Sequence, residues 1–115
     1  MKVIVAGSRD ITNYTVVKEA IEYATQSKKA TEIVSGTARG VDQLGERWAD
    51  ENEIPIAEFP ADWDTHGKSA GYKRNEVMAN YADALVAVWD GESRGTKHMI
   101  DLAKKKGLKV YVHRV

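Results

Sequence analysis

The chain contains no cysteine among its 115 residues. This absence excludes disulfide bonds, thiolate metal sites and cysteine nucleophiles. The sequence also lacks any apolar run long enough to cross a bilayer, so we expect no membrane partner. Residues 1–7 hold only a short apolar run with no cleavage-like segment behind it, which is typical of a buried strand rather than a signal peptide. With no export signal, we expect a cytoplasmic protein.

An excess of charge of either sign is absent as well. The 17 basic and 17 acidic residues give a formal net charge of zero. A protein that covers nucleic-acid phosphates is normally basic, so nucleic acid is not the partner that we expect. A local basic pocket remains compatible with this balance. The length fits one domain, residues 1–115, which can bury a single core without disulfides or metal.

Short apolar runs alternate with helical patterns along the whole sequence. The spacing predicts strands at residues 3–6, 32–35, 55–59, 84–89 and 109–112. It predicts helices at residues 14–27, 40–52, 70–81 and 95–106, with 60–69 as a loop. Thr12 or Asn13 could cap the first helix, and Gly107 could end the last. We therefore predict a Rossmann-like α/β fold, a doubly wound parallel sheet of five strands in the order 3-2-1-4-5 with helices on both faces.

Three glycine-rich loops should meet at the carboxyl edge of this sheet, where doubly wound folds bind ligands. They follow the first, second and fourth strands, at residues 7–10, 35–40 and 90–96, and each leads into a helix. Free backbone N–H groups and the helix dipole at a helix start favour anions, and glycine lets a phosphate approach closely. Such residues also form ordinary turns and caps, so it is the coincidence of three loops that favours a site. The G-x-G-x-x-G and Walker A patterns are absent.

Arg74 is the most informative single residue. It precedes Val77, Met78 and Tyr81 by three, four and seven positions, so helical spacing places it on the apolar, sheet-facing side. An inward arginine at the start of this helix would reach the ligand cleft, where its fork suits phosphate or carboxylate. The alternative is a structural ion pair with an acid such as Asp90. The residues expected to contact a phosphate-bearing ligand are Gly7, Ser8, Arg9, Gly36, Thr37, Ala38, Gly40, Arg74, Asn75, Gly91, Ser93, Gly95 and Thr96.

The segment 62–68 gathers acids, a histidine, a lysine and Trp63. Trp63 could stack on a base as part of a lid, or it could pack against the domain or a partner chain. A metal site from Asp62, Asp64 and His66 would be unspecific, and we predict no metal and no cofactor. Asp42, early in the second helix, is interpreted as an acid that compensates the helix dipole, and Trp48 as a core residue.

Together these motifs resemble the Smf/DprA–LOG (SLOG) superfamily, specifically its small stand-alone branch related to YspA and cpYpsA. The opening strand and loop at 5–9 read V-A-G-S-R, and residues 35–42 are similar to the S-G-x-A-x-G-x-D element shared with DNA-processing protein A. Residues 70–75 resemble an A-G-x-x-R-N signature, and 83–91 with Ser93 and Gly95-Thr96 complete the pattern. The resemblance covers nearly the whole chain. It implies a Rossmann-like fold, binding of nucleotides or nucleotide-derived ligands, and a homo-oligomer, dimeric or larger.

The LOG members of this superfamily are cytokinin-activating phosphoribohydrolases. They carry an arginine before the penultimate strand and a P-G-G-x-G-T-x-x-E element after it. Arg74 matches that arginine and Gly95-Thr96 match the glycine-threonine pair, whereas the expected glutamate falls at Met99. The resemblance thus implies phosphate binding and leaves catalytic turnover uncertain.

We consequently expect a binding or sensor module for a nucleotide-derived small molecule. The first alternative is an enzyme that acts at an N-glycosidic bond, which would need a carboxylate near the sugar; Glu92, Asp62 and Asp64 are candidates beside Arg74. The second alternative is a single-strand nucleic-acid binding module. It would use basic residues that could line one edge, namely Arg9, Arg39, Lys68, Lys73, Arg74 and Arg94.

Overall fold

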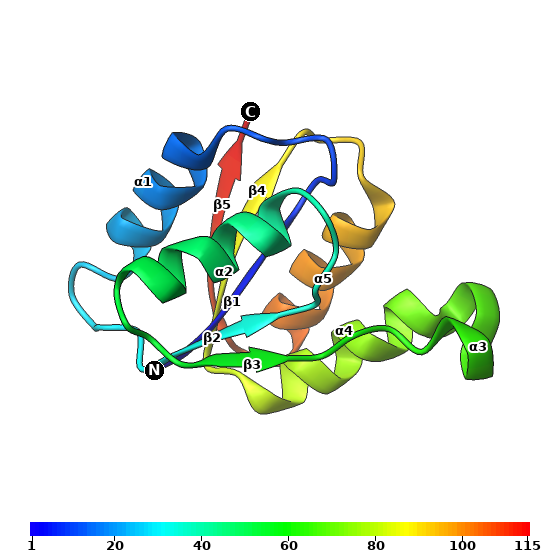
Figure 1. The fold of residues 1–115 in the computed structure, drawn as a ribbon. Helices are drawn as coiled ribbons and strands as arrows, with labels where there is room; N and C mark the ends of the chain where they lie inside the picture. Colours follow the sequence, from blue (N-terminus) through cyan, green and yellow to red (C-terminus); the bar gives the residue numbers. More distant parts are fainter.

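A five-stranded, all-parallel sheet organises residues 1–115 of the computed structural model (Figure 1). The strand order is β3-β2-β1-β4-β5, which confirms the predicted fold class and strand order. The strands are β1 (Lys2–Gly7), β2 (Glu32–Ser35), β3 (Ile56–Glu58), β4 (Ala84–Trp89) and β5 (Lys109–Arg114). The switch in strand order lies between β1 and β4, which are paired over five positions from Val3↔Ala84 to Gly7↔Val88.

Helices cover both faces of the sheet, as Figure 1 shows. The helices are α1 (Tyr14–Ala24), α2 (Val41–Glu51), α3 (Trp63–His66), α4 (Ala70–Tyr81) and α5 (Arg94–Lys105). Alternate residues of β1 enter opposite cores, because successive side chains of a strand point to opposite faces. Val3 and Val5 pack with α1 and α2, whereas Ile4 and Ala6 pack with α4 and α5. The continuous apolar run of β1 is thus buried on both sides.

The helix ends are set by local hydrogen bonds and by glycine. Asn13, rather than Thr12, caps α1 by accepting the N–H of Thr15 at 3.0 Å. The helix stops at Ala24, earlier than the predicted end at residue 27. Gly107 follows α5 with a φ of +79°, the left-handed conformation that glycine adopts readily at helix ends. Trp48 is buried, as predicted.

The prediction of a loop over residues 60–69 is correct for 60–62 and wrong for 63–69. Residues 63–69 form α3 and a 3₁₀ turn, η1 (Gly67–Ser69), and Asp62 caps α3 by accepting the N–H of Thr65 at 3.1 Å. All residues from 62 to 69 are exposed, so capping rather than an apolar stripe forms this helix, and periodicity could not reveal it. Figure 1 shows α3 at the far end of α4, away from the sheet. No helix in the structure is both long and apolar enough to span a membrane.

Candidate ligand-binding cleft

A cleft of about 570 Å³ opens at the carboxyl edge of the sheet, beside the switch between β1 and β4. The loops after β1 and β4, the start of α2, and the α3–α4 segment form its walls. The predicted ligand residues that line it are Gly7, Ser8, Arg9, Ala38, Arg74, Asn75, Ser93, Gly95 and Thr96, together with the candidate acid Glu92. Three lining residues were predicted in other roles, Trp63 as a stacking residue and Arg39 and Lys68 as basic residues at the edge. The lining residues without a predicted ligand contact are Ala6, Asp10, Asp42, Gly71, Tyr72, Met78, Asp90 and Met99.

The other predicted site residues do not line this cleft. They are Gly36, Thr37, Gly40 and Gly91, and the acids Asp62 and Asp64. Close backbone contact explains Gly40, where a Cβ atom would lie 2.6 Å from the carbonyls of Ser8 and Arg9, and a φ of +85° explains Gly91. At Gly36 a Cβ atom would lie 2.5 Å from the Arg74 guanidinium. Thr37 has a φ of +63°, a left-handed conformation that is strained for a β-branched residue. Asp62, Asp64 and His66 form no group that could hold a metal ion.

Arg74 reaches the cleft from the first turns of α4 and is half-buried. Its NH1 group donates to the carbonyl of Gly36 at 2.6 Å, and its Nε donates to Oδ1 of Asn75 at 3.1 Å. None of the three ion pairs in the protein includes Arg74. The alternative of a pair with Asp90 is therefore not what the structure contains. Burial lowers the pKa of Arg74 below its usual value, while the nearby carboxylate of Asp42 opposes this shift.

The helical stripe that pointed to Arg74 is only partly as predicted. Met78 is buried, but Val77 has 52% of its surface exposed. The face of α4 that packs inward is thus centred on Met78 and includes Arg74 one turn earlier, with Val77 outside it.

Asp42 lines the cleft, although from the sequence it was predicted only to compensate the dipole of α2. It does lie in the first turn of α2, but only 6% of its surface is exposed, and it lines the cleft. Its Oδ2 accepts the N–H of Ala38 at 3.2 Å. Burial raises the pKa of Asp42 to about 6, against the opposing effects of the Ala38 N–H and the Arg74 charge. A carboxyl group that titrates near neutral pH therefore lies in the cleft wall.

Side chains in the loop after β4 accept hydrogen bonds from some of the loop's own backbone N–H groups. Asp90 accepts the N–H groups of Glu92 and Ser93 at 2.8 and 2.9 Å, and these bonds hold the pKa of Asp90 below its usual value. Ser93 Oγ accepts the N–H of Thr96, and the first backbone bond of α5 begins at Lys97. The N–H groups at positions 94 and 95 are therefore left without a partner inside the protein, as is usual for the first turn of a helix.

Gly95 differs from the other glycines of the three loops. A Cβ atom at Gly7, Gly36, Gly40 or Gly91 would collide with neighbouring atoms, whereas a Cβ at Gly95 would meet nothing within 4 Å. Its φ is not in the left-handed region either. Neither packing nor backbone conformation requires glycine at this position, and Gly95 lines the cleft.

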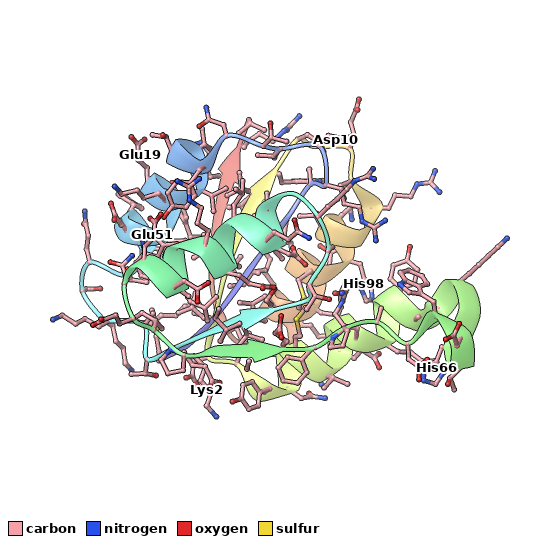
Figure 2. All side chains as sticks on the ribbon, viewed as in Figure 1. Lys2, Asp10, Glu19, Glu51, His66 and His98 are labelled. Carbon is pink, nitrogen blue, oxygen red and sulfur yellow. The ribbon has the colours of Figure 1, made fainter.

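Asn75 is buried, with 6% of its surface exposed. Its Oδ1 accepts from Arg74, and its Nδ2 lies 3.2 Å from both the carbonyl of Gly95 and Nδ1 of His98. The predicted contact of Asn75 with the ligand would therefore compete with bonds inside the protein. In Figure 2, His98 lies between α5 and α4, whereas His66 lies out on α3.

Two aromatic side chains and a balanced set of charges complete the cleft. Trp63 and Tyr72 remain 51% and 45% exposed and line the wall formed by α3 and α4. The cationic lining residues are Arg9, Arg39, Lys68 and Arg74, and the acidic ones are Asp10, Asp42, Asp90 and Glu92. Four charges of each sign leave the cleft formally neutral, so any anion selectivity must come from particular groups rather than from net potential.

Comparisons with known proteins agree with this architecture. A family model, described as the YspA, cpYpsA-related SLOG family, matches residues 1–66. The Gene 61 protein of Mycobacterium phage D29 is 34% identical over 116 residues, which cover 95% of this chain and 93% of the phage protein. The uncharacterized SPbeta prophage-derived protein YoqJ of Bacillus subtilis (strain 168) is 48% identical over 33 residues, which cover 29% of this chain and 19% of YoqJ.

Solved structures share the fold at low sequence identity. DNA processing protein A from Streptococcus pneumoniae matches 96% of this chain with a TM-score of 0.74 and 19% identity. The protein of the same name from Helicobacter pylori, whose structure is described for its single-stranded DNA binding mode, matches 97% with a TM-score of 0.64 and 22% identity. The matched region is 49% of the first of these chains and 64% of the second.

Proposed function

Because the chain belongs to the YspA, cpYpsA-related SLOG family, we propose that its cleft binds a nucleotide or nucleotide-derived small molecule. A phosphate group of this ligand lies between the Arg74 guanidinium and the N-terminus of α5. The protein then acts as a binding or sensor module. A homo-oligomeric state and a cytoplasmic location belong to the same proposal.

The observation that carries the proposal is the half-buried Arg74, whose guanidinium donates only to neutral groups and forms no ion pair, although the Asp42 carboxylate lies nearby. Removing a charged group from water is costly unless a counter-charge or hydrogen bonds compensate. Two of its nitrogens donate to Gly36 and Asn75, and it lines the cleft. The same cleft contains Gly95, in a helix start with two free N–H groups and room for close approach. An anion between these groups would satisfy both of them.

The rest of the cleft suits the remainder of a nucleotide. Its volume of about 570 Å³ lies within the usual range for small-molecule sites. The exposed rings of Trp63 and Tyr72 offer faces on which a base could stack.

Native mass spectrometry of the freshly purified protein tests the proposal first, because it reports a retained ligand and the subunit count together. Calorimetry with a panel of nucleoside phosphates follows, and crystals soaked with the tightest binder locate its phosphate. We expect the phosphate on Arg74 and on backbone N–H groups within 36–40 or 91–96. Lys73→Ala is the matched control, since Lys73 is exposed, lies on the same helix and does not line the cleft. An ordered phosphate bound only elsewhere would contradict the placement.

An enzyme acting at the N-glycosidic bond is the second candidate. Met99 lines the cleft with 1% of its surface exposed, so an apolar group occupies the position at which the family resemblance expects a glutamate. Among the carboxylates suggested from the sequence, Glu92 lines the cleft and Asp62 and Asp64 do not. Asp42 adds a buried carboxyl group with a raised pKa. An assay for released free base separates this candidate from binding alone.

Single-stranded nucleic acid is the third candidate, favoured by the solved relative from Helicobacter pylori. The formal neutrality of the cleft weighs against it, and Lys73 and Arg94 lie outside the lining. The salt dependence of binding separates the two ligand classes, because an extended strand that neutralises several phosphates loses affinity steeply with salt.

A further inference from the structure

A chain of hydrogen bonds leads from His98 to the cleft. Asn75 Nδ2 lies 3.2 Å from His98 Nδ1, and Arg74 Nε lies 3.1 Å from Asn75 Oδ1. At the far end, NH1 of Arg74 donates to the carbonyl of Gly36. His98 itself does not line the cleft, and neither the family resemblance nor the proposed binding site assigns it a role.

The chemistry of the neighbours fixes which atom donates in each bond. Arg74 Nε can only donate, so the Asn75 atom beside it must be the oxygen. The carbonyl of Gly95 can only accept, so the Asn75 atom 3.2 Å from it must be the nitrogen. Arg74 and the carbonyl of Gly95 therefore require the same orientation of the Asn75 amide. The remaining neighbour of this nitrogen, Nδ1 of His98, must therefore accept a hydrogen bond, and the neutral ring carries its proton on Nε2.

We propose that His98 is a positioning residue for Arg74, acting through Asn75 while its Nδ1 carries no proton, and that protonation of His98 releases the guanidinium and weakens anion binding in the cleft. The second half of this inference rests on the proposed function, in which Arg74 anchors the anion.

Protonation cannot be accommodated without the loss of a contact. A proton on Nδ1 would point at the amide hydrogens of Asn75, so two donors would face each other. Rotating the Asn75 amide would restore that bond but turn its nitrogen toward Arg74 Nε, and it would also remove the donor from the carbonyl of Gly95. Asn75 is only 6% exposed, so water cannot readily replace the lost partner. Rotation relieves the clash between the two donors, and the rotated amide no longer accepts from Arg74, which frees the Nε side of the guanidinium.

The surroundings of His98 favour the neutral ring. The ring of Tyr72 meets it edge-on, with centroids 4.5 Å apart. Burial lowers the pKa of His98 below its usual value, while the carboxylates of Glu76 from α4 and Asp101 from α5 oppose this shift. Because this pKa lies below that of an ordinary histidine, the ring is neutral at neutral pH and takes up its proton only on acidification.

Nuclear magnetic resonance on the isotope-labelled protein tests the positioning directly. The side-chain N–H signal of Arg74 is followed while the His98 ring is titrated. We expect part of the Arg74 shift to follow the His98 titration in the wild type. That part should be lost in His98→Asn, whose amide oxygen can accept from Asn75 but does not titrate, which leaves only the response of Arg74 to the nearby Asp42. An Arg74 signal that ignores His98 titration in the wild type would overturn the positioning role, whatever the variant does.

Calorimetry of sulfate binding tests whether protonation of His98 weakens anion binding in the cleft. Sulfate is the probe because its charge is constant over the range in which histidine titrates. Across the His98 transition, located by the same resonance titration, we expect the wild-type affinity to fall on acidification by roughly three- to tenfold relative to His98→Asn, the scale of one lost hydrogen bond. Asp42 titrates in both proteins, so its effect is common to the two curves. His113→Asn, on β5 and away from the cleft, is the control and should follow the wild type.

The outcomes separate this inference from the proposed function. Sulfate that binds with the same pH profile in the wild type and His98→Asn would overturn the linkage while supporting the anion site. Failure of sulfate to bind the wild type at any pH would contradict both the anion site and the linkage. In that case a titrating Arg74 signal would still support the positioning of Arg74 by His98.

Discussion

At the scale of single residues, Arg74 combines a half-buried charge with hydrogen bonds to neutral groups alone. Lysine at this position would keep the charge but lose the planar fork that can bind an anion through two nitrogens. We expect Arg74→Lys to weaken binding of the nucleotide identified by mass spectrometry by roughly 1.5–3 kcal/mol, with the fold retained. Calorimetry and a thermal melt measure the two effects. Unchanged affinity together with a large drop in melting temperature would instead identify Arg74 as a structural residue.

The buried carboxyl group of Asp42 makes stability depend on pH. Its pKa of about 6 lies above the ordinary value of 3.8, so the folded state binds a proton between these values that the unfolded state releases. Stability therefore falls as pH rises through this window, and the full cost is present above it. Asp42→Asn removes the titration while keeping an oxygen for the Ala38 N–H.

We expect Asp42→Asn to raise the free energy of unfolding at about pH 7.5 by up to about 3 kcal/mol, and to flatten its dependence between about pH 4 and about pH 6. Denaturant titrations at several pH values measure both effects. Asp64→Asn is the control, because Asp64 is exposed on α3 and lies outside the cleft. Equal pH profiles for the wild type and Asp42→Asn would show that this carboxyl group is not buried in solution.

At the scale of the helices and strands, we expect a substitution in the first turn of α5 to have opposite effects on stability and on ligand binding. Glycine weakens a helix relative to alanine by roughly 0.5–1 kcal/mol, and nothing in the packing requires it at position 95. We expect Gly95→Ala to stabilise the free protein by up to about 1 kcal/mol and to weaken phosphate binding by about 1–3 kcal/mol, because the new methyl group occupies the approach to the free N–H groups.

A denaturant titration and phosphate calorimetry measure these opposite effects. Lys104→Ala, at an exposed position near the end of the same helix, should change neither property by more than about 0.5 kcal/mol. If Gly95→Ala is more stable but binds phosphate as tightly as the wild type, the phosphate does not bind at this end of α5.

The exposed α3 offers a test of where the base lies. Because no residue of α3 is buried, we expect Trp63→Ala to change stability by no more than about 0.5 kcal/mol. Loss of a stacking face should weaken nucleotide binding by about 1–3 kcal/mol and leave inorganic phosphate binding unchanged. Calorimetry with the two ligands measures the difference, and Val77→Ala, an exposed apolar residue on α4, is the control. Equal effects of Trp63→Ala on both ligands would contradict stacking.

The regular elements were predictable because they follow from local patterns. The run at 84–89 is apolar on both faces, and a strand of this kind must be covered from two sides, which predicts a parallel sheet. The short α3 was not predictable from periodicity, since it is held by one cap at Asp62 and buries nothing. Val77 was placed on the wrong face because it lies at the border of the stripe through Arg74 and Met78, where only the packed structure decides.

The candidate site was predictable only in part, for a similar reason. Glycine and hydroxyl residues after β1 and β4 indicated the correct sheet edge, because carboxyl ends of parallel strands meet there. The burial of Asp42 depends on packing around the whole cleft, and an acid in a first helical turn is ordinarily a surface residue. The contact between Asn75 and His98 joins residues 23 positions apart on two helices, and no local pattern signals it.

At the scale of the whole molecule, the chain has a cleft at the carboxyl edge of its sheet but lacks the glutamate that the resemblance to the LOG enzymes implies. Met99 fills that position and is buried, and a thioether cannot transfer a proton to a leaving base. We expect no release of free base from nucleoside monophosphates, measured by chromatography against a heat-denatured control. Met99→Glu, which restores the missing acid, serves as the comparison. Release by the wild type well above the control would favour the enzyme and direct attention to Asp42 and Glu92.

The left-handed backbone at Thr37 predicts which substitution at this position selection for stability would favour. Left-handed backbone costs a residue with a β-carbon roughly 1–2 kcal/mol, and glycine escapes this cost. Most random exchanges in a protein lower its stability, yet exchange for glycine at this position would relieve strain. A laboratory population selected for heat tolerance alone should therefore lose this threonine early. If Thr37 is instead retained under selection for function, this threonine contributes to function at a cost in thermal stability.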